Sequence, residues 1–176
     1  MKRVSSKVLY RGRVATLSLD TFRKPDGETY LRETIRHPPS VVILPILEDG
    51  RVVLIRQFRH AVNGIIYEIP AGTRERGESS LGCAKRELME EAGYQASRWK
   101  RLCEFYPAPG ISTERMTLFA ARGLKKLEKP VPMDKDEQIT VQPVSARQAL
   151  RLVRQNKIVD AKSILGILWG LDRIKW

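Results

Sequence analysis

Residues 72–94 read GTRERGESSLGCAKRELMEEAGY. Apolar side chains recur here at i, i+3, i+7 and i+11, the spacing of one face of an α-helix, in the order Leu81, Ala84, Leu88 and Ala92. Ser79 or Ser80 offers a hydroxyl that can cap the first turn, and Gly93 is a common helix stop. We therefore expect a glycine-containing loop that leads into a helix ending near Ala92.

Three glutamates share one flank of this expected helix. Glu87 and Glu91 lie one turn apart, and Glu90 lies on the other side of Glu87. Like charges at this spacing repel unless cations sit among them, and oxygen ligands favour a hard cation such as Mg²⁺ or Mn²⁺. A metal ion held in this way suits the cleavage of a phosphate anhydride. The alternative is a solvated helix surface on which Arg86 pairs with Glu90.

The spacing of residues 72–94 resembles the signature of the Nudix hydrolases. The matching positions are Gly72, Glu78, Arg86, Glu87, Leu88, Glu90, Glu91 and Gly93. Tyr94 stands where an aliphatic residue is usual. The resemblance implies an α/β (α+β) fold, built as an α/β/α sandwich with a mixed sheet, and hydrolysis of a nucleoside diphosphate linked to another moiety.

The same resemblance assigns roles within this stretch. It implies two or three Mg²⁺ (or Mn²⁺) ions bound by four groups: the carboxylates of Glu87, Glu90 and Glu91 and the backbone carbonyl of Ala71. It implies structural roles for Gly72, Glu78, Arg86 and Gly93. Glu78 and Arg86 would form a pair that fixes the loop on the helix.

Short segments outside the signature look like the ADP-ribose pyrophosphatase branch of this family. They are RQFR at 56–59, EIPAG at 68–72, PAPGISTE at 107–114 and IVDAKSI at 158–164. The branch implies conversion of ADP-ribose and water to AMP and ribose 5-phosphate. Other sugar nucleotides or capped RNA are alternative substrates, and a regulator that binds ADP-ribose without hydrolysing it is a further alternative.

Further site residues follow from the branch. The catalytic carboxylates are expected to be Glu137, Glu114 and Glu90, with Glu137 favoured as the general base and Glu114 next. An ordinary loop acid is the alternative for Glu137. The expected substrate-binding residues are Arg59, Arg56, Arg32 and Glu33. Arg59 would hold the phosphate or terminal ribose, because its planar fork can bond phosphate bidentately; the alternative is a surface arginine at a strand end. Arg32 and Glu33 would reach the adenine from the other subunit of a domain-swapped homodimer.

The rest of the chain reads as strands with two closing helices. Residues 1–39 are expected to form antiparallel strands that mediate dimerisation, with a turn at 25–27, and residues 40–176 to form the hydrolase domain. Within that domain we expect strands at 40–47, 51–59, 65–69, 99–106, 116–121 and 138–141, and helices at 145–155 and 160–171.

Composition narrows the class of protein. With 176 residues and 42% apolar residues, the chain can fold as one compact unit or one with a small added lobe. No apolar stretch approaches the roughly 18 residues of a membrane span, and no secretion signal is expected. Two cysteines without a motif fit a reducing cytoplasm. The net charge of +12 favours anionic ligands, but no aromatic cluster accompanies it, so nucleic acid is not the expected partner.

Overall fold

A computed structural model describes residues 1–129, 131 and 138–173. Their contacts divide the chain into two compact units, Met1–Pro39 with Phe105–Met116 and Ser40–Glu104 with Thr117–Trp176. The segment 105–116, which lies within the expected 40–176 domain, is joined to the first unit by backbone hydrogen bonds. Ile35 N–H donates to the Ile111 carbonyl over 2.8 Å, and Thr113 N–H donates to the Ile35 carbonyl over 2.9 Å.

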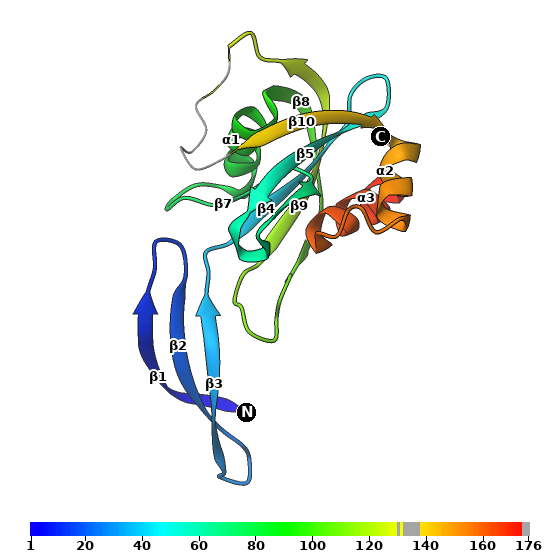
Figure 1. The fold of residues 1–176 in the computed structure, drawn as a ribbon. Helices are drawn as coiled ribbons and strands as arrows, with labels where there is room; N and C mark the ends of the chain where they lie inside the picture. The colour runs from blue at the N-terminus through cyan, green and yellow to red at the C-terminus, as the bar shows by residue number, and fades with distance from the viewer. Residues whose placement is uncertain (130, 132–137, 174–176) are drawn as a thin grey trace. The chain divides into compact units, whose positions relative to one another are not determined.

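The first unit contains an antiparallel sheet with the strand order β1-β2-β3 (Figure 1). The strands are β1 (Lys2–Arg11), β2 (Thr16–Arg23) and β3 (Thr29–Arg36). This confirms the expected N-terminal meander. β1 and β2 are separated by a turn in which Gly12 N–H bonds to the Ala15 carbonyl over 2.9 Å. The turn between β2 and β3 contains Gly27 at a φ of +92°, a conformation that favours glycine.

The second unit contains two sheets, with strand orders β7-β4-β9-β8 and β10-β5-β6. The strands are β4 (Ser40–Pro45), β5 (Arg51–Arg59), β6 (Gly64–Glu68), β7 (Ala71–Thr73), β8 (Tyr94–Phe105), β9 (Met116–Lys126) and β10 (Ile139–Ser145). The described helices are α1 (Ser80–Ala92), α2 (Ala146–Arg154) and α3 (Ala161–Arg173), with a short 3-10 helix, η1, at His60–Val62.

β4 is buried along its whole length because helices cover both of its faces. Val41 and Ile43 belong to an apolar cluster that includes Leu88 of α1. Leu44 meets α3, where a Cβ added to Gly170 would lie 2.6 Å from Leu44 Cδ2. Successive side chains of a strand point to opposite faces, so α1 and α3 pack on opposite sides of the sheet (Figure 1). The expected α/β/α sandwich is therefore confirmed.

Several strands differ from the sequence prediction: β9 and β10 extend beyond their predicted ends, to Lys126 and Ser145, β7 is not predicted and β8 begins early. The pattern does not predict β7, because three residues around a central glycine carry no alternation; the strand forms by pairing with β4, with Ala71 opposite Val42. β8 begins at Tyr94, directly after α1, whereas the pattern predicts a start at residue 99. In the first residues of β8, the alternation of apolar and polar side chains is obscured by exposed polar residues such as Arg98.

The ends of α1 follow the predicted signals. Ser79 is the N-cap, and its Oγ accepts a hydrogen bond from Gly82 N–H over 3.0 Å. Gly93 ends the helix with a φ of +70°, and its N–H bonds to the carbonyls of Leu88 and Met89. Both ends of the helix that carries the glutamates are thus fixed by local hydrogen bonds.

We predict that Ser79→Ala lowers the free energy of unfolding by about 1 kcal/mol, because it removes the acceptor that caps the first turn of α1. Urea denaturation measures the change. Ser80→Ala is the matched control, since the adjacent hydroxyl makes no hydrogen bond that the structure records within the described residues, and it should change stability by less than about 0.5 kcal/mol. Equal losses of stability in the two variants would contradict the role of Ser79 as the N-cap of α1.

Candidate active site

The three glutamates of α1 lie at different depths in the second unit. Glu87 and Glu91 are buried, at 8% and 3% exposure, while Glu90 is partly exposed. Glu91 Oε2 accepts a hydrogen bond from the Ala71 backbone N–H over 2.8 Å. The structure therefore brings together two of the predicted metal ligands, Ala71 and Glu91, at the start of β7.

Gly72 makes room for the next carboxylate. A Cβ at position 72 would lie 1.9 Å from Glu87 Oε1 and 2.0 Å from its carboxyl carbon, far inside contact distance. No positive φ requires a glycine at this position. Glycine is needed here for space, because the Glu87 carboxylate packs directly on the backbone of β7.

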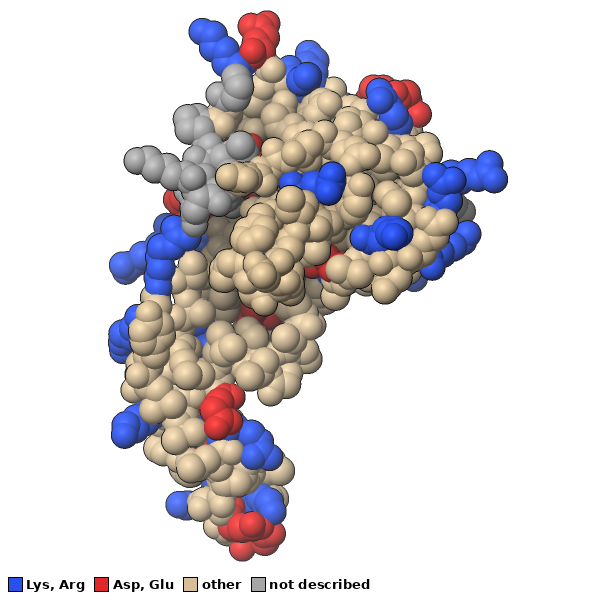
Figure 2. Space-filling view, viewed as in Figure 1, with Lys and Arg blue, Asp and Glu red and all other residues tan. Residues whose placement is uncertain are grey.

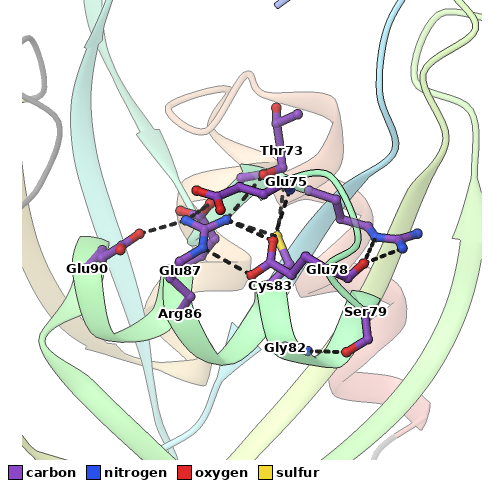
Figure 3. Close-up of polar contacts among 11 residues, drawn as sticks. Thr73, Glu75, Glu78, Ser79, Gly82, Cys83, Arg86, Glu87 and Glu90 are labelled. Carbon is purple, nitrogen blue, oxygen red and sulfur yellow. Dashed lines mark hydrogen bonds and ion pairs between the residues drawn. The ribbon is translucent and has the colours of Figure 1, made fainter.

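The guanidinium of Arg86 joins the loop to the helix (Figure 3). Its Nε lies 3.1 Å from Glu78 Oε1, and its Nη1 lies 2.7 Å from Glu87 Oε1 and 2.8 Å from Glu90 Oε2. Its Nη2 also donates to the Thr73 carbonyl over 3.2 Å. The predicted Glu78–Arg86 pair is present in this geometry, and so is the Arg86–Glu90 pair that was the alternative interpretation of the helix surface.

The charges of this cluster stabilise one another. Burial by itself lowers the pKa of Arg86, but hydrogen bonding to Glu78 and the charge of Glu87 outweigh burial and hold this pKa above its ordinary value. Burial by itself raises the pKa of Glu78. Hydrogen bonds from Arg86 and from the backbone N–H of Glu75 outweigh burial and bring the pKa of Glu78 below its ordinary value. Both groups are therefore ionised near neutral pH.

The donor set suits a hard divalent cation, because it consists of carboxylate oxygens beside a backbone segment. Within the described residues, however, no group of three or more His, Cys, Asp or Glu side chains is arranged to hold a metal ion. Arg86 Nη1 contacts an oxygen of both Glu87 and Glu90, so a cation that bridged these carboxylates would compete with it. The ligand set therefore stays a prediction.

Arg59 stands at the end of β5 in a two-point ion pair with Glu68. Its Nε and Nη2 lie 2.6 Å and 2.7 Å from the two carboxylate oxygens. Glu68 is buried, at 1% exposure, and also binds Lys162 Nζ over 2.5 Å. Hydrogen bonds to Glu68 raise the pKa of Arg59 against the effect of burial, and the charge of Glu91 raises it further. Arg59 is thus a partly exposed arginine at the end of β5 that Glu68 holds in place, and its role in substrate binding stays a prediction.

Sequence reasoning missed the part played by Glu68, although it quoted the EIPAG segment that contains this residue. The local sequence gives no signal that Glu68 is buried, although a glutamate that is buried is expected to have a partner. The structure supplies two partners, Arg59 and Lys162.

The structure does not bring Arg56 together with Arg59. Arg56 is exposed, and its guanidinium lies 5.3 Å from the ring centre of Tyr67, its partner across β6. Residues three apart in a strand point to opposite faces of the sheet. Arg56 therefore has a contact of its own, away from the Glu68 ion pair.

The remaining predicted residues of the described chain lie in the first unit. Arg32 is exposed, with its guanidinium 4.6 Å from the Tyr30 ring centre, and Glu33 is exposed opposite Leu19. Glu114 Oε1 lies 3.6 Å from His37 Nδ1. Glu137, the predicted general base, lies outside the described residues. The geometry above therefore concerns the second unit alone.

Comparison with known proteins identifies the family of the chain. Residues 36–164 match the model of the NUDIX domain. The chain belongs to the Nudix family. This Nudix protein is therefore assigned to the hydrolases, and members of its family generally need divalent metal ions.

Relatives match almost the whole Nudix chain. It is 34% identical over 166 residues to the ADP-ribose pyrophosphatase of Bacillus subtilis, covering 94% of this chain and 90% of the relative. It is 33% identical over 166 residues to a methanol dehydrogenase activator of Bacillus methanolicus, with the same coverage. A crystal structure of an ADP compounds hydrolase superposes with a TM-score of 0.82 at 20% identity, covering 99% of this chain and 94% of the other, and this likeness supports the fold.

We predict that Gly72→Ala leaves the protein folded but lowers its hydrolytic turnover by roughly 10- to 100-fold, because the added methyl group displaces the Glu87 carboxylate. Steady-state kinetics with nucleoside diphosphate substrates and thermal melting measure the two effects. Gly64→Ala is the matched control, since its added Cβ would meet only the Val62 carbonyl at 3.7 Å. Turnover of Gly72→Ala at the level of Gly64→Ala would contradict a requirement for the Glu87 position.

Proposed function

We propose that this Nudix protein hydrolyses the diphosphate of ADP-ribose, giving AMP and ribose 5-phosphate, with Mg²⁺ or Mn²⁺ as its cofactor. The observation that carries the proposal is the packing of the Glu87 and Glu91 carboxylates against the backbone of residues 71 and 72, with Arg86 beside them. Similarity to the Bacillus subtilis ADP-ribose pyrophosphatase over 94% of the chain supports the choice of substrate.

Each residue of the site has a part in this proposal. Glu87, Glu90, Glu91 and the Ala71 carbonyl would hold two or three ions. A bound divalent cation neutralises diphosphate charge and lowers the pKa of a water molecule. Arg86 aligns two of the carboxylates, and Arg59 presents its exposed edge to a phosphate or to the terminal ribose. Glu137 is the proposed general base, and Glu114 is the next candidate.

Other functions of the same fold are less well supported. A different sugar nucleotide or capped RNA remains an alternative substrate, and the net charge of +12 would assist binding of RNA. On the face drawn in Figure 2, Lys and Arg side chains are scattered and do not form one continuous patch. The relative named as a methanol dehydrogenase activator favours a second candidate, a regulator of another enzyme. The complete set of helix glutamates argues for hydrolysis.

We expect the purified protein with Mg²⁺ to convert ADP-ribose to AMP and ribose 5-phosphate, and Glu91→Gln to abolish this turnover. The amide retains an oxygen for the Ala71 N–H but lacks the negative charge that a cation requires. Product formation followed by chromatography, with and without a chelator, is the measurement. Glu48→Gln, at an exposed ion pair with Arg98, is the control and should keep full activity.

Two results would reject the proposal. Full activity of Glu91→Gln, or of the chelated protein, would refute the metal assignment. Faster turnover of GDP-mannose or capped RNA than of ADP-ribose, at equal concentration, would refute the substrate.

We also propose that the protein works as a homodimer through the strands of residues 1–39, in the cytoplasm. All ten residues of β1 are exposed, and β1 is an edge strand, which can pair with or pack on another copy. Val8 and Tyr10 are 41% and 67% exposed. Both cysteines are free, and no described helix is long and apolar enough to cross a membrane. Arg32 and Glu33 would then serve the partner's site.

For the dimer, we predict that Val8→Glu shifts the protein to a monomer, because it places a charge in the apolar surface of β1. Analytical ultracentrifugation at micromolar concentration measures the mass. Val62→Glu, at an apolar residue of η1 that is 63% exposed in the second unit, is the matched control and should leave the mass unchanged. A wild-type protein that sediments as a monomer would refute the proposed homodimer.

A further inference from the structure

The backbone of residues 68–71 is tied to both helices that flank the sheet. Ala71 N–H donates to Glu91 Oε2 of α1 over 2.8 Å, and Ile69 N–H donates to Ser163 Oγ of α3 over 2.8 Å. The same short segment begins with Glu68, which holds Arg59. The proposed metal ligand Glu91 and the proposed substrate-binding residue Arg59 therefore both bond to one short segment that α3 helps to hold.

Lys162 of α3 completes the surroundings of Glu68. Its Nζ lies 2.5 Å from Glu68 Oε2 and 2.9 Å from Asp160 Oδ2, and its side chain is only 12% exposed. A carboxylate as buried as Glu68 is stable when more than one donor surrounds it, because a buried charge with an incomplete set of partners is costly. Ser163 extends the network, since its hydroxyl donates to Asp160 Oδ2 over 2.5 Å.

Arg59 uses only one edge of its guanidinium for Glu68. Nε and Nη2 carry the two bonds, while the structure records no hydrogen bond from Nη1 to any described residue. The side chain is 37% exposed, so a solute can reach part of it. Because a guanidinium is planar and rigid, fixing one edge sets the direction in which the other edge points.

We propose that Glu68 and Lys162 are positioning residues for Arg59. Lys162 holds the Glu68 carboxylate, the carboxylate holds the Nε–Nη2 edge of Arg59, and the opposite edge is thereby aimed at the phosphate or ribose of the substrate. The proposal rests on the proposed function. It adds a role for α3, which lies outside the signature of residues 72–94. A purely structural ion pair would fasten α3 without affecting substrate binding.

A double-mutant cycle distinguishes positioning from structure. We expect Lys162→Met to raise the KM for ADP-ribose about tenfold with a smaller change in kcat, which is the effect of losing a charge-assisted contact. Arg59→Met should raise KM at least as much. The double variant should be no worse than Arg59→Met, because Lys162 acts through Arg59. Lys162→Arg should restore most of the affinity.

Lys157→Met is the matched control, since it removes the same charge from an exposed side chain on the segment before α3 and should leave KM unchanged. Independent, additive effects of Lys162→Met and Arg59→Met would overturn the proposal, as would a wild-type KM in either single variant. Glu68→Gln, which keeps the shape of the side chain and removes its charge, gives a second route and should also raise KM. Loss of the folded state in both Lys162→Met and Glu68→Gln would assign the network a structural role and overturn positioning.

Failure of the proposed function would give a different experimental result. A wild-type protein without turnover of ADP-ribose would refute hydrolysis and would leave the positioning role to be read from calorimetric binding of ADP-ribose to the same variants. Binding weakened equally by Arg59→Met, by Lys162→Met and by the double variant would still support positioning, and unweakened binding in Lys162→Met would reject it.

Discussion

The contact of one guanidinium with three carboxylates underlies the whole site. Arg86 reaches Glu78 in the loop and Glu87 and Glu90 on the helix, all within 3.1 Å of its nitrogens. Without this cation the glutamates of one helical turn would repel each other at close range. With it, the loop between β7 and α1 is fastened to the helix, and the cluster still has more negative than positive groups. The acidic side chains are thereby held in a defined arrangement.

The second constraint is the space between a strand and a helix. The Glu87 carboxylate lies so near the backbone of Gly72 that no side chain fits there, and the Glu91 carboxylate accepts a hydrogen bond from the next residue back, Ala71. Two acidic groups are thereby buried with a defined direction. A buried carboxylate costs free energy unless donors surround it, so the short strand β7 and the helix α1 depend on each other.

Local patterns predicted the part of the site that lies close together in the sequence. The helix, its caps and the shared flank of the three glutamates follow from helical spacing within 23 residues, whereas the Glu78–Arg86 pair is implied by the resemblance to the Nudix signature. The ion pairs of Glu68 could not be predicted in this way, since Lys162 is 94 positions away and meets it only when α3 packs on the sheet. β7 was missed because pairing with β4, and no pattern of its own, makes it a strand. The attachment of residues 105–116 to the first unit likewise arises from long-range backbone hydrogen bonds.

The contact between Lys162 and Glu68, which are 94 positions apart, affects the order in which the chain folds. On a ribosome, the signature loop and α1 emerge well before α3, so the Glu68 carboxylate and Arg59 must exist for a time without the lysine that completes their network. Closing such a distant contact is slower than forming a helix, because the intervening chain must first be ordered. The nascent chain thus acquires its carboxylate cluster early and its fully aligned arginine late, when the C-terminal helix docks.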